Sequence, residues 1–408
     1  MTGNKDNIAL ASNDAKQNDR IKRSVAKQVA VALSGGVDSL VAAFLLKKEY
    51  PNLFGIHFTT GYEEKINSNE YLKEENLSLK TGSNDIVEHL KKQLDIPIYC
   101  VDLKEQFEQD VVSYFIETYK IGKTPNPCIV CNKKIKFGIL LKAAGELGAD
   151  FLATGHYARI CFNNQSSNLN DSVALLRGKD SLKDQSYFLS MLSNEQLKNA
   201  IFPLGDFTKH EVVNIAAQNS LTPIHKKESQ DICFIQQDSF ANFILSKCTN
   251  SLVQDNNKEF SPENISPFTS GDIVTTNGNI VGRHRGLYSY TIGQRRGLNC
   301  PGPAPYYVKK IDMEQNRLIV GFKEELFEKE CTLNHINWLS NEPYFADSSL
   351  RVTTCIRYSH KPVLSTLILN DAESTTKVIF DEPQLSVTPG QCAVFYDGDK
   401  VLGAGFIQ

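Results

Sequence analysis

The sequence predicts an α/β fold with a doubly wound parallel sheet, followed by a small central domain and a C-terminal β-barrel. In the first half, short Val- and Ile-rich runs alternate with segments of helical apolar spacing, which is typical of a parallel sheet covered by helices on both faces. After about Gly271 the chain shows short apolar segments separated by turn-forming residues, which is typical of β structure. The length of 408 residues also exceeds what one hydrophobic core usually organises.

The alternation begins with a strand at Gln28–Leu33 and a helix at Ser39–Lys48, where Leu40, Ala43 and Phe44 follow helical spacing. The elements expected next are a strand at Leu53–Phe58, a helix at Ile86–Leu94, a strand at Ile98–Val101, helices at Gln106–Tyr119 and Lys134–Leu147, a strand at Phe151–Ala153 and a helix at Lys209–Ala217. The strands expected at the C-terminal end are Arg317–Val320, Arg351–Ile356, Thr366–Leu369, Lys377–Phe380, Ala393–Tyr396 and Val401–Ile407.

The domain boundaries follow changes in composition along the chain. Residues 1–26 are polar and lack the apolar core of a signal peptide, so we expect a disordered tail there. We expect the α/β domain over residues 27–230, the central domain over 231–293 and the barrel over 294–408. The polar stretches 59–85 and 249–270 are expected to be mobile loops or insertions.

Composition and charge exclude some classes of protein. No apolar run approaches the roughly 20 residues that span a bilayer, so we expect no membrane partner and a cytoplasmic location. Ten cysteines without an export signal indicate reduced thiols, which favours metal binding or redox chemistry over structural disulfides. The net charge of −3 gives no global attraction for a polyanion, so binding of nucleic acid would need local clusters of Lys and Arg.

The strongest motif is Ser34-Gly35-Gly36-Val37-Asp38-Ser39, at the point where the first strand passes into the first helix. The two glycines let the backbone N–H groups approach a ligand, and the helix N-terminus adds a positive dipole end, which together predict a phosphate-binding loop. The spacing is not that of a Walker P-loop. The segment resembles the PP-loop of the N-type ATP pyrophosphatases, which cleave ATP between its α and β phosphates.

Three cysteines indicate the chemistry that follows ATP cleavage. Cys128 and Cys131 lie three residues apart just before an expected helix, whose N-terminus should lower the pKa of a thiol, and Cys233 lies in a later segment. Spacing alone leaves open whether such thiolates carry sulfur or bind a metal such as zinc.

Several segments together resemble the tRNA-specific 2-thiouridylase family. These are Thr124–Lys133 with the following Lys-Ile-Lys-Phe, Ala153–Tyr157, Lys183–Leu189, Glu228–Ile235 and Tyr290–Gly297, in the order that the family has. The resemblance extends from about Val29 to the C-terminus. It implies ATP and Mg²⁺ as cofactors, a tRNA with a wobble uridine as substrate, a central domain that binds tRNA, and a sulfur carrier or cysteine desulfurase as partner.

The resemblance also implies roles for individual residues. Cys131 would be the nucleophile and Cys233 would carry the persulfide, with a disulfide between them as a possible product. The ATP site would be lined by Ala32, Leu33, Ser34, Gly35, Gly36, Val37, Asp38, Ser39, Phe58 and Gly155. The target base would contact Asn126, Pro127 and Cys128, and tRNA would contact His156, Lys183, Asp184, Gln185, Arg357, Tyr358 and Gln391.

The implied reaction has a physical reason. The C2 oxygen of uracil is a poor leaving group, so it is first adenylated, and the PP-loop and Mg²⁺ stabilise the departing pyrophosphate. Sulfur then attacks the activated carbon and AMP leaves. An anticodon loop is a suitable target, because its bases can be turned into a pocket without opening a duplex.

The sequence departs from the family at Cys128, where many members carry Asp. Cys128, Cys131 and Cys233 could therefore hold a four-iron, four-sulfur cluster with one open iron, which would be a second sulfur mechanism. Residues around Phe58 also depart from the family pattern. The other cysteines are interpreted as small buried apolar residues, at positions 100, 161, 248, 331, 355 and 392.

Two other functions compete with this interpretation. An amidating synthetase could share the PP-loop, but it would not need Cys131 and Cys233. A non-catalytic tRNA-binding protein would have no reason to retain the loop together with the thiols. His156 follows a strand and a glycine, so we expect it to face the ligand crevice at the carboxyl end of the sheet, although a core imidazole is the alternative.

Overall fold

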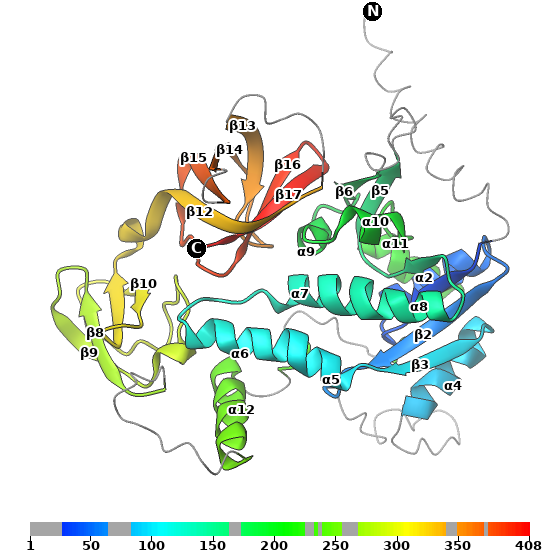
Figure 1. Cartoon of the computed structure of the whole chain (residues 1–408), viewed down its shortest axis with the longest axis horizontal. Coiled ribbons are helices and arrows are strands. Elements are labelled where there is room, and N and C mark those ends of the chain that lie inside the picture. The colour runs from blue at the N-terminus through cyan, green and yellow to red at the C-terminus, as the bar shows by residue number, and fades with distance from the viewer. Residues whose placement is uncertain are drawn as a thin grey trace, which may run out of the picture.

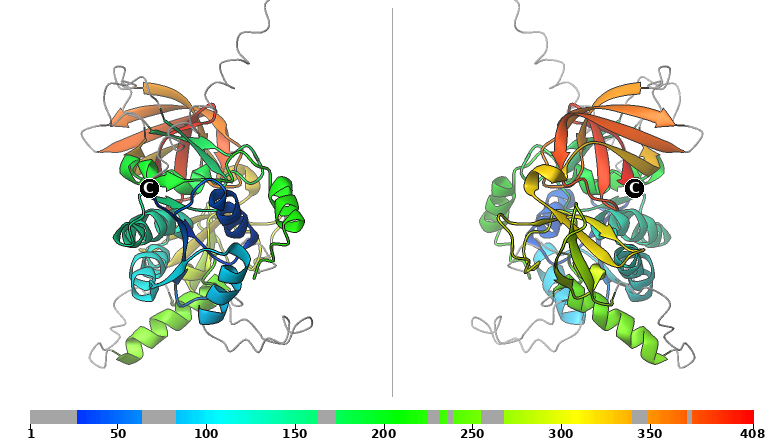
Figure 2. Two further views of the ribbon diagram at one scale, coloured as in Figure 1. Left: turned by 90° about the vertical axis from the view of Figure 1, so that its right-hand side faces the viewer. Right: turned by 90° about the vertical axis from the view of Figure 1, so that its left-hand side faces the viewer.

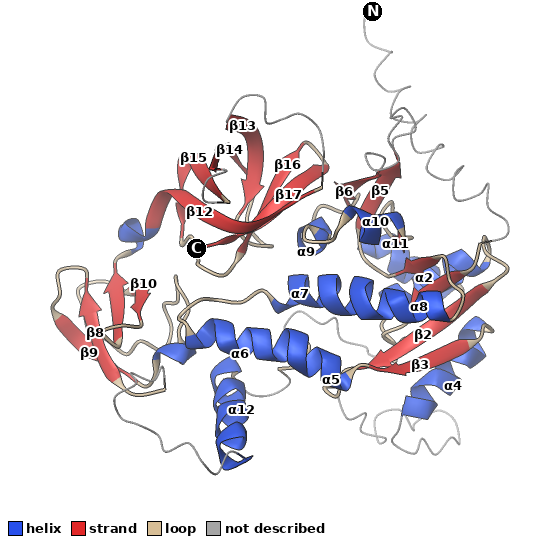
Figure 3. Ribbon diagram, in the orientation of Figure 1, coloured by secondary structure: helices blue, strands red, loops and turns tan. Residues whose placement is uncertain are grey.

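The structure is a computed structural model with an α/β part, a central β part and a C-terminal barrel (Figure 1). It describes residues 27–63, 83–162, 173–224, 232–235, 239–254, 268–339, 349–370 and 374–408. The predicted tail at 1–26 and most of the predicted loops at 59–85 and 249–270 lie outside these residues. Figure 3 shows that helices gather in the α/β part and strands dominate the other two parts.

The α/β part contains a five-stranded parallel sheet in the order β3-β2-β1-β4-β7. Its strands are β1 (Val29–Ala32), β2 (Leu53–Thr59), β3 (Ile98–Asp102), β4 (Phe151–Ala153) and β7 (Ala200–Ile201). Alternate residues of β1 face two separate cores, with Val29 and Val31 in one and Ala30 and Ala32 in the other. The predicted doubly wound parallel sheet is thereby confirmed.

Helices cover both faces of this sheet. On the face of Val29 and Val31 lie α2 (Val37–Lys47), α4 (Ser83–Leu94) and α11 (Lys209–Gln218). On the other face lie two long helical rods, which run side by side in Figure 1. The first comprises α5 (Lys104–Phe107), η1 (Glu108–Val112) and α6 (Ser113–Lys120), and the second comprises α7 (Pro127–Val130), η2 (Cys131–Leu140) and α8 (Leu141–Glu146).

The second rod differs from the predicted helix Lys134–Leu147, because it begins at Pro127. Asn126 caps its N-terminus by accepting a hydrogen bond from the Ile129 N–H at 3.4 Å, and Pro127 suits a first helical position, where no N–H is needed. Both Cys128 and Cys131 therefore lie within the helix rather than before it. The segment Cys131–Leu140 is wound as a π-helix.

After β4 the chain leaves the parallel sheet in a hairpin that sequence analysis missed. Strands β5 (Ala158–Phe162) and β6 (Val173–Arg177) pair with each other, and β6 joins the barrel strand β17 through Leu176 and Lys400. The short helices α9 (Ser186–Leu189) and α10 (Asn194–Lys198) follow. The hairpin thus joins the α/β part to the barrel by backbone pairing.

The central part holds a four-stranded sheet in the order β10-β11-β8-β9. Its elements are β8 (Gly271–Thr275), β9 (Ile280–His284), η4 (Leu287–Ser289), β10 (Tyr307–Asp312), β11 (Arg317–Gly321) and η5 (Lys323–Leu326). The strand predicted at Arg317–Val320 pairs here and not with the barrel, because its partners β8 and β10 come from the central segment. Helix α12 (Phe240–Gln254) extends into a stretch predicted as a loop, and the two views of Figure 2 show it projecting from the body.

The C-terminal part is the predicted barrel. It closes in the order β12-β15-β14-β13-β16-β17, with β17 pairing back to β12. The strands are β12 (Phe327–Trp338), β13 (Ser349–Cys355), β14 (Val363–Asn370), β15 (Thr375–Leu385), β16 (Cys392–Asp397) and β17 (Lys400–Ile407). Phe380 and Phe395 are fully buried in its core. In the described part of the chain, no helix is both long enough and apolar enough to span a bilayer.

Candidate functional site

The loop between β1 and α2 has the form of a phosphate cradle. Gly35 takes a φ of +83°, which glycine adopts without strain, and its carbonyl accepts a hydrogen bond from the Ile224 N–H at 2.8 Å. The Ser39 hydroxyl donates to the Gly36 carbonyl at 2.9 Å and lies 3.3 Å from the Ser34 hydroxyl. These bonds tie Ser34, Gly36 and Ser39 to one another at the N-terminus of α2, where phosphate binding stays a prediction.

Gly155 lies against this loop. A Cβ added at Gly155 would meet the Asp38 carbonyl carbon at 2.8 Å and the Ser39 nitrogen at 2.9 Å, which is closer than real Cβ atoms approach. Only glycine therefore lets the end of β4 pack on the backbone of the phosphate loop. Phe58, at the end of the neighbouring strand β2, is half-buried and packs against the larger core.

The structure adds two partners of Asp38 that sequence reasoning did not assign. The Lys209 ammonium donates to both carboxylate oxygens, at 2.7 and 2.8 Å, and the Tyr157 hydroxyl donates at 2.7 Å. Lys209 is the first residue of α11, whose N-terminus is capped by Thr208 and Glu211. The capping pattern could have located the start of this helix, but nothing local indicates that it meets Asp38.

His57 was also missed. Its Nδ1 lies 2.9 Å from the Leu33 carbonyl, which fixes the end of β1, and its Nε2 is buried without a hydrogen-bond partner among the described residues. A buried polar atom without a partner is costly. The signal that could have found it is its position beside Phe58 at the carboxyl end of β2.

The structure brings Cys128, Cys131 and Cys233 together at the start of the second rod. All three are free thiols, and Cys131 lies near enough to Cys128 and Cys233 for their charges to raise its pKa. The charge of Cys233 likewise raises the pKa of Cys128. Cys233 is held there by its neighbour Phe234, which is buried with its ring centroid 5.2 Å from that of Phe115 on α6. The predicted convergence of the distant thiol on the Cys-x-x-Cys segment is thus present in the fold.

The predicted direction of the thiol pKa is wrong. Burial raises the pKa of Cys131 to about 12 and that of Cys128 to about 11, and it also raises the pKa of Cys233. Lys136 acts in the opposite sense on all three thiols. Although Cys128 and Cys233 reach the surface, the loss of solvation outweighs the helix N-terminus on which the prediction rested.

The family resemblance implies Mg²⁺ and raises an iron–sulfur cluster as a second group. Across the described ranges, no set of three or more His, Cys, Asp or Glu side chains is arranged to hold a metal ion, and the cluster stays a prediction. Mg²⁺ commonly binds through one or two carboxylates and the phosphates of its substrate. Asp38, the carboxylate within the phosphate loop, has the chemistry for this role, although both of its oxygens accept from Lys209 in this structure.

His156 lies between the phosphate loop and the thiols. Its ring is buried, with Nδ1 at 2.7 Å from the Thr154 hydroxyl and Nε2 at 3.5 Å from the Lys136 ammonium. Burial, assisted by the charge of Lys136, lowers the pKa of His156 well below its ordinary value, so the ring is neutral. The environment of His156 is therefore that of a hydrogen-bonded core imidazole, which was the alternative to a ring facing the ligand crevice. Its contact with tRNA stays a prediction.

The segment before Cys128 is held by the barrel. Gln391 donates from Nε2 to the carbonyls of Thr124 at 3.2 Å and Pro125 at 2.9 Å. The Thr124 N–H donates to the Pro389 carbonyl at 2.8 Å. Gln391, implied as a tRNA contact, thus lies beside the segment implied to border the target base.

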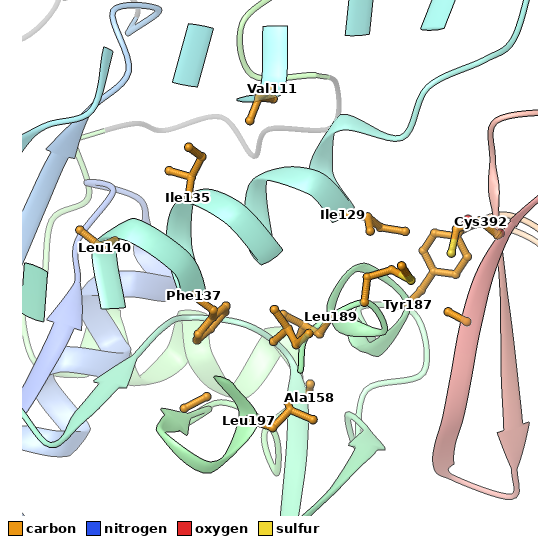
Figure 4. Close-up of a cluster of buried hydrophobic side chains, with 14 of the residues drawn as sticks. Val111, Ile129, Ile135, Phe137, Leu140, Ala158, Tyr187, Leu189, Leu197 and Cys392 are labelled. Carbon is orange, nitrogen blue, oxygen red and sulfur yellow. The ribbon is translucent and has the colours of Figure 1, made fainter. Parts of the chain in front are cut away.

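Tyr187 makes a second connection from the barrel. Its hydroxyl donates to the Cys392 carbonyl at 2.8 Å and accepts from the Asn126 side chain at 3.4 Å. Figure 4 shows the side chain of Tyr187 extending from α9 toward the barrel, beside Cys392 and Ile129. Pro127, which follows Asn126 in the chain, is buried as well.

The remaining predicted tRNA residues lie on two neighbouring loops. Asp184 accepts hydrogen bonds from the backbone of Gly178 and Ser186, both at 3.0 Å, and Gln185 accepts one from the Tyr157 N–H at 3.0 Å. Asp184 thus stabilises its own loop and Gln185 joins that loop to Tyr157, while Lys183 is half-exposed beside them.

On the second loop, Arg357 donates to the Leu385 carbonyl at 2.9 Å. Tyr358 is exposed, and its ring lies 4.5 Å from that of Phe188. Because Phe188 belongs to α9, just after the first loop, the two loops meet at this ring pair.

The other cysteines are only in part as predicted. Cys355 and Cys392 are buried, and Cys161, Cys248 and Cys331 are partly buried. Cys100 is exposed, contrary to prediction, because β3 is the edge strand of the parallel sheet.

Known proteins resemble the chain over nearly its whole length. Family models match in three consecutive segments, described as a tRNA methyl transferase HUP domain (residues 27–237), a tRNA methyl transferase PRC-barrel domain (262–322) and an aminomethyltransferase β-barrel domain (328–407). A tRNA-specific 2-thiouridylase of Desulfosudis oleivorans is 42% identical over 380 residues, covering 93% of this chain and 94% of that protein. Those of Geotalea uraniireducens and Geobacter metallireducens are 39% and 40% identical, covering 95% and 94% of this chain and 96% and 97% of their own.

Proposed function

Because the chain belongs to the tRNA-specific 2-thiouridylase family, we propose that it adenylates the C2 oxygen of the wobble uridine in tRNA and replaces that oxygen with sulfur from a cysteine persulfide. The thiolation of tRNA is the activity of the family. The target position, the roles of single residues and the sulfur route are the finer parts of the proposal. Membership in this family also decides against the amidating synthetase and the non-catalytic tRNA-binding protein.

One observation carries the proposal: two adjacent residues connect the phosphate loop with the thiols. Gly155 packs on the backbone of Asp38 and Ser39, and His156 contacts Lys136, which acts on all three thiols. A uracil held between these groups would meet the α-phosphate on one side and sulfur on the other. Such proximity is what an adenylation followed by sulfur transfer requires.

In the first step, the PP-loop binds ATP and holds the pyrophosphate that leaves. The N–H group of Gly36 and the hydroxyls of Ser34 and Ser39, which bond to one another within the loop, would exchange those bonds for phosphate oxygens, together with the N–H group of Gly35. Asp38 would hold Mg²⁺, which supplies positive charge to the phosphates. The C2 oxygen of uridine attacks the α-phosphate, and the bond to pyrophosphate breaks.

In the second step, sulfur replaces the adenylated oxygen. A sulfur carrier or cysteine desulfurase leaves a persulfide on Cys233, and the Cys131 thiolate attacks its inner sulfur, so that a Cys131–Cys233 disulfide forms and hydrosulfide is displaced. Hydrosulfide attacks C2, the C–O bond breaks and AMP leaves with that oxygen. A thiol reductant then restores both cysteines.

The substrate contacts follow from the same arrangement. Asn126, Pro127 and Cys128 border the thiols and are proposed to contact the target base. The tRNA is proposed to lie across Lys183, Asp184 and Gln185 and the barrel residues Arg357, Tyr358 and Gln391. Single-stranded loops present bases to such a pocket at low cost.

The experiment is mass spectrometry of nucleosides from wobble-uridine tRNA incubated with ATP, Mg²⁺ and a persulfide donor. We expect 2-thiouridine from the wild type, none from Cys131→Ser or Cys233→Ser, and wild-type amounts from the control Cys100→Ser, whose thiol lies on β3. The absence of 2-thiouridine with wild type would contradict the proposed function.

Cys128→Asp separates the two sulfur mechanisms. A persulfide relay needs only Cys131 and Cys233, so this variant should keep its activity without iron. Activity that requires anaerobic reconstitution with iron and sulfide, and that is lost in Cys128→Asp, would replace the relay with a cluster mechanism.

A further inference from the structure

Lys136 is a cation in the thiol site to which sequence reasoning assigned no role. It is half-buried on the second rod. Its ammonium lies 3.5 Å from His156 Nε2, and it forms no ion pair with a carboxylate among the described residues. Its neighbour Lys134, by contrast, is exposed and pairs with Asp110 at 2.7 Å. Among the described residues the charge of this ammonium thus has no carboxylate partner, and burying a charge without a counter-charge costs free energy.

The winding of the helix places Lys136 on the face of the thiols. In an α-helix, residues five apart lie on different faces, whereas the hydrogen bonds of a π-helix join residues five apart. Cys131 and Lys136 are five apart within the π-helix Cys131–Leu140, so this winding brings them nearer to one face than an α-helix would, and the charge of Lys136 acts on the Cys131 thiol. Gly138 reflects the same winding, because its Cβ position would lie 3.0 Å from the Lys133 carbonyl oxygen.

The contact with His156 fixes the direction of the ammonium. Lysine can only donate, so Nε2 of His156 accepts, and Nδ1 carries the proton that it donates to the Thr154 hydroxyl. The neutral ring leaves the charge of Lys136 uncompensated. The titratable groups that act on the three thiols are Lys136, Glu63 and the thiols themselves.

We propose that Lys136 is the positioning residue that supplies the positive charge for the anionic sulfur of Cys131 during sulfur transfer. The proposal rests on the persulfide route described above. The attacking thiolate is an anion in a site where burial opposes the charged form, and Lys136 is the cation placed to offset that cost. Adenylation, in contrast, takes place at the PP-loop and needs no charge at this position.

The test compares Lys136→Met, Lys136→Arg and the control Lys134→Met on the full chain. The enzyme is loaded with persulfide, mixed with tRNA and ATP, and quenched within one turnover across pH 6.5 to 9.5. We expect Lys136→Met to lower the rate of 2-thiouridine formation about 10-fold at neutral pH and to move the acid limb of the pH profile up by about one unit. Lys136→Arg and Lys134→Met should stay within about threefold of the wild type.

Two further measurements separate the loss of the Lys136 charge from misfolding of the variant. Pyrophosphate release should be unchanged in all variants, which reports an intact fold and adenylation site. Alkylation of Cys131 by iodoacetamide, followed by peptide mass spectrometry, should slow about 10-fold in Lys136→Met only, because the thiolate is the reactive form.

The proposal is overturned if Lys136→Met keeps the wild-type rate, pH profile and alkylation, or if Lys136→Arg is as slow as Lys136→Met. A wild type that forms no 2-thiouridine would defeat the proposed function instead, and the alkylation comparison would still test Lys136. If Lys136→Met does not fold, the pH profile of the thiolation rate of Lys136→Arg tests the proposal. A profile like that of the wild type supports a role for the positive charge, and a different profile opposes it.

Discussion

At the scale of single residues, Gly155 shows how one missing side chain makes room for the phosphate loop. Gly155→Ala would push a methyl group into the backbone of Asp38 and Ser39. We expect ATP affinity to fall at least ~10-fold, because the loop N–H groups lose their alignment. Isothermal titration calorimetry with a non-hydrolysable ATP analogue measures this.

The matched control is Gly145→Ala in α8, where nothing lies within 4 Å of the added Cβ. It should leave ATP affinity unchanged and stabilise the fold by about 0.5–1 kcal/mol, because alanine favours a helix interior over glycine. Unchanged affinity in Gly155→Ala would show that the loop tolerates displacement.

His156 predicts how stability depends on pH. Its pKa in the folded protein lies well below the ordinary value of 6.5, so below that pH the unfolded chain takes up a proton that the folded chain refuses. This contribution to stability is present above pH 6.5 and is lost as the pH falls below it, by up to about 1.4 kcal/mol per pH unit.

Calorimetric Tm values at pH 7.5 and 5.5 measure the effect. The wild type should lose more stability on acidification than His156→Gln, which has no proton to take up. Equal losses in the two proteins would mean that other groups control the acid sensitivity.

At the scale of elements, the loop before β16 holds the start of the helix that carries the thiols. Gln391→Leu removes both hydrogen bonds to Thr124 and Pro125. Because a small displacement of reacting groups can cost orders of magnitude in rate, we expect kcat to fall about 10-fold, while KM for tRNA changes less than about threefold. Steady-state thiolation kinetics measure both constants.

Tyr358→Ala is the contrasting variant. This exposed ring lies on the proposed tRNA surface, so its loss should raise KM and leave kcat unchanged. If Gln391→Leu also changed only KM, a direct tRNA contact would explain Gln391 better than positioning.

At the scale of the whole molecule, Arg177 on β6 connects the α/β part with the barrel. Its guanidinium lies 3.7 Å from the centre of the Tyr396 ring and 3.8 Å from the Asp184 carboxylate. We expect Arg177→Met to lower Tm by about 2–4 °C and to raise KM for tRNA. The reason is that the loop at 183–185 and the barrel residues proposed to bind tRNA would no longer be held in one relative orientation. Thermal unfolding and thiolation kinetics measure these changes.

Arg351→Met provides the comparison within the barrel alone. Arg351 forms an exposed pair with Asp381 at 2.7 Å, and exposed ion pairs contribute little to stability. A fall in Tm as large as that of Arg177→Met would show that loss of an arginine, rather than loss of the interdomain contact, is responsible.

The sequence by itself determined the features that depend on neighbouring residues. The phosphate loop follows from two glycines between a buried strand and a helix, and the alternation of strands and helices follows from apolar spacing. The capping residues Asn126 and Pro127 also signal the true start of the second rod, although the predicted helix began later. Family motifs then supplied the identity of the thiols.

Only the tertiary structure decided what depends on residues far apart in the chain. Lys209 meets Asp38 across 171 positions, Cys233 joins the Cys-x-x-Cys segment, and β12 closes the barrel on β17. It also reversed the predicted direction of the Cys131 pKa and brought Lys136, through π-helical winding, to where its charge acts on that thiol. The reason is that these contacts depend on which faces of distant helices and strands pack together. The same packing sets the loss of solvation that shifts a pKa, and the pattern of neighbouring residues does not encode it.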